Sequence, residues 1–254
     1  LGIEPTGDQD PFGLRRAAQG IVEVSWAVKR SLKFDSFFAV WKENVLQQKL
    51  NQIDRSIFFN ISEHTFQEKQ RRIQQYILER LYTFAWPKPV PSADTIDAVL
   101  AGSCDDLLDV MERIVSLRRF NGDPGLLKAA KVIERTANIL KGAKPEEWRG
   151  QSVDPNLLQE PLEQTLWGLY ESNQADIVQL IDQRAYDQAT TRFGEVFYAP
   201  LHAFFDKVMV NVPDEALRKN RLALMSAIHT LYTGQVADLS KLAILRQSNT
   251  KTES

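Results

Sequence analysis

The feature that most constrains how this sequence folds is the spacing of its apolar residues, which recur at intervals of three and four along most of the chain. Alternating apolar and polar residues are scarce, and Gly and Pro fall mostly between the helical stretches. We therefore predict an all-α fold, a multi-helix array of about ten helices. They are expected from Asp10 to about Leu32 and over residues 36–50, 62–84, 94–101, 105–119, 126–141, 155–173, 174–186, 186–197 and 213–233.

Composition places the chain among ordinary globular proteins. Its 254 residues are 43% apolar and 25% charged, enough for one large domain or two small ones with a hydrophobic core. Apolar runs are too short to span a membrane, and no signal peptide is visible, so we expect no membrane partner. The single cysteine, Cys104, excludes an internal disulfide and fits a reducing cytosol. Because the first residue is Leu1 rather than Met, we expect a fragment or a processed chain.

The sequence contains no recognisable catalytic motif. There is no Gly-rich phosphate loop before a helix and no G-x-S-x-G turn. His64, His202 and His229 are far apart and lack metal-ligand spacing, so we predict no metal site and no catalytic residue. These absences favour a binding or positioning module. The net charge of −2 is a mild argument against nucleic acid, although cations can still gather on one face.

The most basic local stretch is residues 11–33, with five cations against Glu23 alone. Arg15 and Arg16 fall in the first turn of the predicted helix, where the helix dipole disfavours cations. A phosphate of RNA, a carboxylate at a domain junction, or simple solvation would each account for them. Further along, Lys29 and Arg30 lie within a turn of Trp26, which either offers a stacking face or packs against a neighbouring helix.

Two further clusters carry candidate residues. Arg118 and Arg119, beside Asn121, end a predicted helix, where cations are also favoured by the dipole. In the helix over 213–233, Arg221 shares an apolar stripe with Leu217 and Leu224, so we expect it to be buried and paired with Asp206 or another carboxylate. Off that stripe, and freer to meet a ligand, are Arg218 and Lys219.

Several segments, in order, resemble the β subunit of bacterial-type glycyl-tRNA synthetases over nearly the whole chain. They are PTGDQDPFGLRRAA (5–18), ILERL (77–81), DTIDAVLA (94–101), ANIL (137–140), FFDKVMV (204–210) and DEALRKNRLAL (214–224). Each segment is weak alone, but together they are specific. The chain departs from the family at Glu134 beside Arg135 and in the link Asn211–Pro213.

The resemblance implies that catalysis and transfer-RNA recognition lie on different subunits. The α subunit would hold the adenylate-forming site with ATP and Mg, so this region would be non-catalytic and need no cofactor of its own. The β subunit would recognise glycine transfer RNA in a heterotetramer, in a bacterial-type cytoplasm or an organellar stroma. Its C-terminal part would be a helical anticodon-binding domain of the kind found in arginyl-tRNA synthetases. Because glycine anticodons end in two cytosines, splayed anticodon bases would be read by hydrogen bonds or stacking.

We accordingly expect an N-terminal helical segment over 1–103, following an upstream HD-like domain. An anticodon-binding bundle would follow over 104–245, and a disordered tail over 246–254. Candidate RNA contacts are Arg15, Arg16, Lys29, Arg30, Arg118, Arg119, Asn121, Arg218 and Lys219, while Asp206 and Arg221 are expected to be structural. One rival interpretation is a helical scaffold for subunit assembly without RNA readout. Another, a catalytic synthetase in its own right, would need ATP-binding motifs that the sequence lacks.

Overall fold

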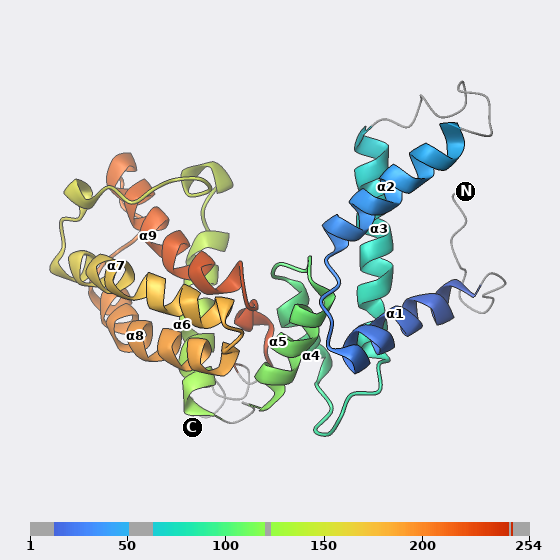
Figure 1. Ribbon diagram of the computed structural model, residues 1–254. Helices are drawn as coiled ribbons and strands as arrows, with labels where there is room; N and C mark the ends of the chain where they lie inside the picture. The colour runs from blue at the N-terminus through green and yellow to red at the C-terminus, as the bar shows by residue number, and fades with distance from the viewer. Residues whose placement is uncertain (1–12, 51–62, 120–122, 244, 246–254) are drawn as a thin grey trace. The chain divides into compact units, whose positions relative to one another are not determined.

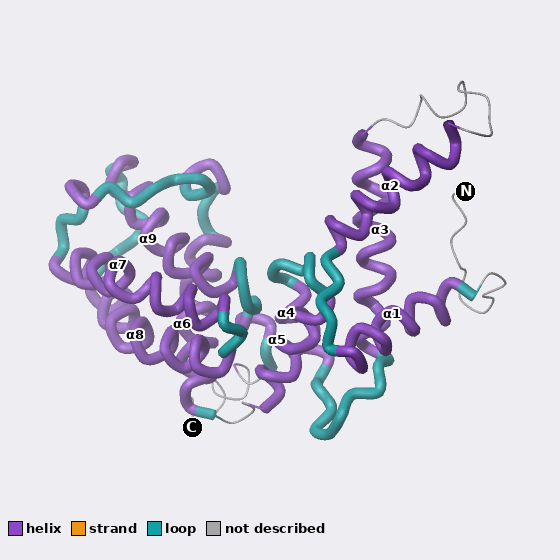
Figure 2. The backbone as a smooth tube through the Cα atoms, in the orientation of Figure 1, coloured by secondary structure: helices purple, strands orange, loops and turns teal. Residues whose placement is uncertain are grey.

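The protein is all-α, as the apolar spacing predicts. The structure, a computed structural model, describes residues 13–50, 63–119, 123–243 and 245. Across those ranges every regular element is a helix, apart from one isolated bridge between Lys33 and Asp106 (Figures 1 and 2). The predicted helix start at Asp10 and Pro11, the candidate Asn121, and the tail 246–254 lie outside the described residues.

The chain divides into two compact units. Unit 1 comprises residues 1–88 and 104–111, and unit 2 comprises residues 89–103 and 112–254. The helix α5 (Leu107–Arg119) therefore contributes residues to both units. The assignment of 1–103 and 104–245 to different functions stays a prediction.

Unit 1 holds α1 (Leu14–Val28), α2 (Phe34–Leu50), α3 (Glu63–Leu78) and the 3-10 helix η1 (Glu79–Tyr82). The amphipathic helix α1 packs against α3 and η1, and it buries Ala18, Val22 and Ser25. This face leaves Arg15 and Arg16 at the margin of the contact, where they are partly or fully exposed.

Residues 104–107 belong to unit 1 because they bond to the link before α2. Backbone hydrogen bonds join Phe34 N to Asp105 O at 2.8 Å and Leu107 N to Leu32 O at 3.0 Å. The Asp105 carboxylate also accepts from the amide of Asp35 at 2.8 Å. These bonds satisfy amides in the first turns of α2 and α5 that have no partner inside their own helix.

Unit 2 is a helical bundle built from α4 (Ala93–Leu100), α6 (Pro124–Lys141), α7 (Pro161–Asp182), α8 (Tyr186–Lys207) and α9 (Glu215–Thr233), with the 3-10 helices η2 (Pro145–Glu147), η3 (Pro155–Leu157) and η4 (Leu239–Lys241). The helices α6 and α8 approach closely at Gly194, where a Cβ would stand 2.8 Å from Ala129 N. Fully buried side chains such as Phe193, Phe197 and Tyr232 fill the bundle.

Helix starts in unit 2 follow local capping rules. The Asp123 carboxylate accepts from Gly125 N at 2.6 Å ahead of α6, and Pro124 occupies the first helical position. Asp214 caps α9 in the same way, accepting from Leu217 N at 3.0 Å. Both caps lie near predicted helix starts because they depend only on neighbouring residues.

Two helices extend beyond the ends predicted for them. We expected a break at Asn173, but α7 continues because the Asn173 side chain donates to Leu169 O at 2.7 Å and accepts from Arg192 at 2.8 Å. We also expected the next helix to stop at Phe197, but α8 runs through Pro200 to Lys207. Burial of Leu201 and Phe204 beyond the proline offsets the roughly 3 kcal/mol that an interior proline costs.

Candidate functional site

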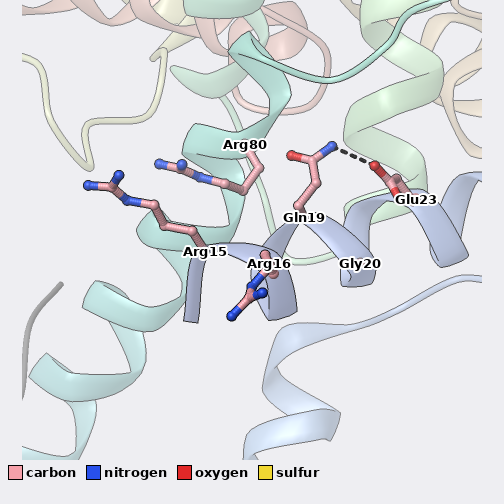
Figure 3. Close-up of a pocket in the computed structure, with 6 residues that line it drawn as sticks. All are labelled: Arg15, Arg16, Gln19, Gly20, Glu23 and Arg80. Carbon is pink, nitrogen blue, oxygen red and sulfur yellow. Dashed lines mark hydrogen bonds between the residues drawn. The ribbon is translucent and has the colours of Figure 1, made fainter. Parts of the chain in front are cut away.

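An open cavity of about 380 Å³ lies on unit 1 and is lined by three arginines (Figure 3). We name it the arginine pocket and define it by Arg15, Arg16, Gln19, Gly20, Glu23 and Arg80. It joins α1 to η1, so residues far apart in the sequence meet there.

The register of α1 sets one wall of the arginine pocket. Arg15, Gln19 and Glu23 follow one another at intervals of four residues, which places them on one side of the helix. The Glu23 carboxylate accepts a hydrogen bond from Gln19 Nε2 at 3.0 Å. Gly20 adds no side chain, and a Cβ there would meet no atom within 4 Å, so the cavity stays open at this position.

Arg80 supplies the opposite wall, and sequence reasoning missed it as a site residue. Its guanidinium lies 5.0 Å from the Tyr76 ring centroid and 3.5 Å from the Glu79 carboxylate. In Figure 3 the side chains of Arg15 and Arg80 extend to the same side, and Arg16 turns away from them. Arg80 stands in the ILERL segment, near the end of the predicted helix 62–84, where the helix dipole also favours a cation.

The arginine pocket is electropositive. Its lining carries three guanidinium groups against the single carboxylate of Glu23. Several cations around one cavity favour an anionic ligand, and the guanidinium group matches phosphate or carboxylate geometry through paired N–H donors. The pocket therefore has the chemistry of an anion site.

Trp26 is packed within an aromatic cluster, which decides between the two interpretations of this residue. Its ring meets Trp86 at 6.1 Å and Phe84 at 6.3 Å, both edge to face. The ammonium group of Lys29 lies 2.8 Å from the Trp26 ring centroid. Lys29 and Arg30 themselves are exposed, beyond the end of α1.

The two arginines predicted as RNA contacts at the end of α5 differ in exposure. Arg119 is exposed, whereas Arg118 is only 9% exposed. Burial, together with the neighbouring Arg119 charge, lowers the pKa of the Arg118 guanidinium. Arg113, on the same helix, is buried and donates to Val236 O at 2.8 Å and to Ser103 O, so it holds the unit together.

Arg218 and Lys219 both have partners inside unit 2. Arg218 donates to Glu147 Oε1 from Nη2 at 2.8 Å and from Nε at 3.1 Å, and it reaches Val212 O at 3.1 Å. This hydrogen bond is the main reason that the pKa of Glu147 lies below its usual value. Lys219 pairs with Glu215 at 2.6 Å on the helix surface.

Arg221 is buried and paired with a carboxylate, as expected, but the carboxylate is that of Glu163 and not that of Asp206. Its Nε donates to the carboxylate of Glu163 on α7, and its Nη1 donates to Met209 O at 2.7 Å. Asp206 is exposed and lies 3.9 Å from His202 Nε2. The sequence stripe identified the buried arginine, but a carboxylate 58 residues away pairs with it through the packing of α7 on α9.

No group of three or more His, Cys, Asp or Glu side chains in the described ranges is placed to hold a metal ion. The side chain of His64 lies outside those ranges. In the same part of the chain, no helix combines the length and the apolar character that a membrane span requires.

Comparisons with known proteins agree with the resemblance that the sequence segments indicate. Residues 1–101 match the family model described as "Glycyl-tRNA synthetase beta subunit". The chain is 32% identical to the glycine–tRNA ligase β subunit of Desulforamulus reducens over 96% of its own length and 32% of that protein. The corresponding protein of Coxiella burnetii is 34% identical over 96% of this chain and 33% of its own length.

A third relative, the glycine–tRNA ligase β subunit of Janthinobacterium sp. (strain Marseille), is 35% identical over 96% of this chain. The chain spans about a third of the length of these curated relatives: 32%, 33% and 32%. The matched segment, the helical architecture and the order of the motifs together assign the chain to the family of glycyl-tRNA synthetase β subunits.

Proposed function

We propose that this chain is the transfer-RNA-binding region of a glycine–tRNA ligase β subunit. In this proposal it positions glycine transfer RNA for ATP-dependent glycylation by an α subunit. That subunit would hold ATP and Mg, and the ligase would act in a bacterial cytoplasm or an organellar stroma. The arginine pocket is the observation that carries the proposal, since it gathers three guanidinium groups from two helices around an open cavity.

Phosphate is the anion that this pocket would meet on RNA. In protein–DNA complexes about half to two-thirds of the hydrogen bonds go to phosphate and sugar, and these contacts fix the register of the complex. Arg15 and Arg80, which extend to the same side, would bind one backbone phosphate. Arg16 would lie toward the next phosphate along the RNA backbone. Lys29 and Arg30, exposed at the other end of α1, would extend this phosphate-binding surface.

Anticodon recognition is assigned in this proposal to the bundle of unit 2. Arg119 is the exposed cation at the end of α5, next to the predicted contact Asn121. Arg218 and Lys219 would have to exchange Glu147 and Glu215 for the RNA, so their contribution would be smaller. Loss of affinity on changing the anticodon would support this assignment.

The experiment is a titration of the whole 254-residue chain with a glycine tRNA transcript at several salt concentrations. Each phosphate contact contributes about −0.7 to −0.9 to the slope of log K against log salt. A steep slope, with weaker binding when the two anticodon cytosines are replaced, supports both parts of the proposal. Binding that neither salt nor the anticodon changes would contradict it.

A second function, subunit assembly, is favoured by apolar residues exposed on α1. Val24 is 60% exposed and Val28 is 61% exposed, outside the buried stripe of Ala18 and Val22. If subunit assembly is the function, the α subunit would bind this exposed apolar surface of α1. Replacing both valines by lysine would then abolish co-purification with the α subunit while leaving affinity for the tRNA unchanged; unchanged co-purification would reject the reading.

A further inference from the structure

Met209 is the methionine of this chain whose side chain reaches solvent. The sequence has three methionines, and the structure describes all of them. Met209 is 71% exposed, whereas Met111 and Met225 are both 0% exposed. It lies in the link between α8 and α9, which comprises residues 208–214. The lining of the arginine pocket does not include it, so the function proposed above leaves this side chain without a role.

The local backbone explains why Met209 faces solvent. The chain is extended directly after α8, where Val208 has φ −116° and ψ 120°. Successive side chains of an extended segment point to opposite sides. Val208 and Val210, on either side of the methionine, are only 7% and 4% exposed. Because both valines pack into unit 2, the side chain between them is directed outward.

Buried hydrogen bonds hold the backbone of this link in place. Arg221 Nη1 donates to Met209 O at 2.7 Å, and the same arginine pairs with the buried carboxylate of Glu163. The amide of Val208 donates to Phe204 O at 2.8 Å, at the end of α8. These bonds use backbone atoms and not the thioether. A chemical change at the sulfur therefore leaves them intact.

An exposed thioether is open to oxidation by peroxides. The sulfur lone pair of Met209 attacks one oxygen of hydrogen peroxide, so that an S–O bond forms and the O–O bond breaks. The leaving hydroxide takes the proton from the transferred oxygen and departs as water. Sulfur is oxidised by two electrons and the peroxide is reduced by two. The product, methionine sulfoxide, is polar and chiral, and methionine sulfoxide reductases convert it back to the thioether.

We propose that Met209 is a reversible oxidation site of this chain. Peroxide oxidises it before the other two methionines, unit 2 keeps its fold in the oxidised state, and methionine sulfoxide reductases restore it. Met111 and Met225 are enclosed in the core, so their sulfurs react only when the surrounding structure opens locally. The proposal does not depend on the proposed function, because it requires no RNA.

The test of selectivity treats the whole chain with hydrogen peroxide and follows each methionine by peptide mass spectrometry, which also separates oxygen uptake at Cys104. We expect Met209 to be oxidised at least about tenfold faster than Met111 and Met225, a ratio that corresponds to about 1.4 kcal/mol of local opening. In urea, where the chain is unfolded, the three rates should converge. Comparable rates in the folded chain, or earlier oxidation of either buried methionine, would overturn the proposal.

Two leucine variants assign the fast phase to a residue. Met209→Leu removes the exposed sulfur at similar volume, so the folded variant should lose the fast uptake of oxygen by methionine. Met225→Leu makes the same change at a buried position and should keep the fast phase. Far-ultraviolet circular dichroism verifies that both variants retain their helices. A fast phase that persists in Met209→Leu would place the reactive methionine elsewhere and refute the proposal.

The test of reversibility uses the chain oxidised at Met209 alone. Its urea unfolding midpoint should equal that of the unaltered chain, because the sulfoxide projects into solvent and the backbone bonds remain. The two classes of methionine sulfoxide reductase each accept one sulfoxide epimer, so both together should restore Met209 completely and either alone only in part. A lower unfolding midpoint, or a sulfoxide that both reductases leave in place, would contradict a reversible site on an intact fold.

Discussion

Arg221 on α9 and Glu163 on α7 form an ion pair inside unit 2, with the arginine side chain 6% exposed and the glutamate side chain 0% exposed. The second oxygen of Glu163 accepts from the amide of Glu160 at 2.8 Å, which completes a capping box at the start of α7. One carboxylate therefore joins two helices and also satisfies a helix terminus.

Removing one partner of this pair is expected to be costly. Arg221→Met leaves the Glu163 carboxylate buried without its cation, which should lower the free energy of unfolding by about 3–5 kcal/mol. Denaturant unfolding measures the change. The double variant Arg221→Met with Glu163→Gln removes both charges and keeps an oxygen for the Glu160 amide, so it should recover part of the loss. As a control, Lys219→Met breaks the surface pair with Glu215 and should change stability by less than about 1 kcal/mol.

The close approach of α6 and α8 is predicted to exclude a side chain at position 194. In Gly194→Ala the new methyl group would lie 2.8 Å from Ala129 N and from Gly125 O, which are backbone atoms that cannot move aside cheaply. We expect a loss of about 1–3 kcal/mol in the free energy of unfolding. Gly168→Ala on α7 meets no atom within 4 Å and should instead stabilise by about 0.5–1 kcal/mol. Equal effects of the two substitutions would disprove the packing argument.

The arginine pocket predicts a change in the salt dependence of tRNA binding. Arg15→Gln and Arg80→Gln should each weaken binding and reduce the slope of log K against log salt by about one, as expected for a lost phosphate contact. Arg71→Gln on α3 makes the same charge change at an exposed position outside the pocket lining. A slope that falls equally in all three variants would indicate a general charge effect rather than a site.

The Arg218–Glu147 contact predicts a specific dependence of stability on pH. Because the folded pKa of Glu147 lies below its ordinary value of 4.5, the contact stabilises the protein above that pH. This stabilisation is lost as pH falls from about 4.5 through the folded pKa. Glu147→Gln should remove this part of the acid sensitivity, measured as the midpoint of urea unfolding between pH 6 and 3.5. Glu146→Gln, one residue earlier and exposed, should follow the unaltered chain.

Much of the helical architecture could be predicted because it depends on residues close in sequence. Capping by Asp123 and Asp214 and the apolar face of α1 involve neighbours within one or two turns. Of the arginine pocket, two of the three guanidinium groups could be proposed from the sequence. Arg80 was missed because nothing local distinguishes it from a cation at a helix end.

The sequence by itself determined the all-α class, most helix positions and the presence of a buried arginine on the apolar stripe of α9, since these follow from periodicity and local hydrogen bonding. Only the tertiary structure decided that α7 continues through Asn173, that α8 continues through Pro200, and that Glu163 rather than Asp206 pairs with Arg221. Each of these outcomes depends on groups brought together by packing. The free energy of burial and of long-range hydrogen bonds outweighs local preferences of a few kcal/mol, as it does around the interior proline.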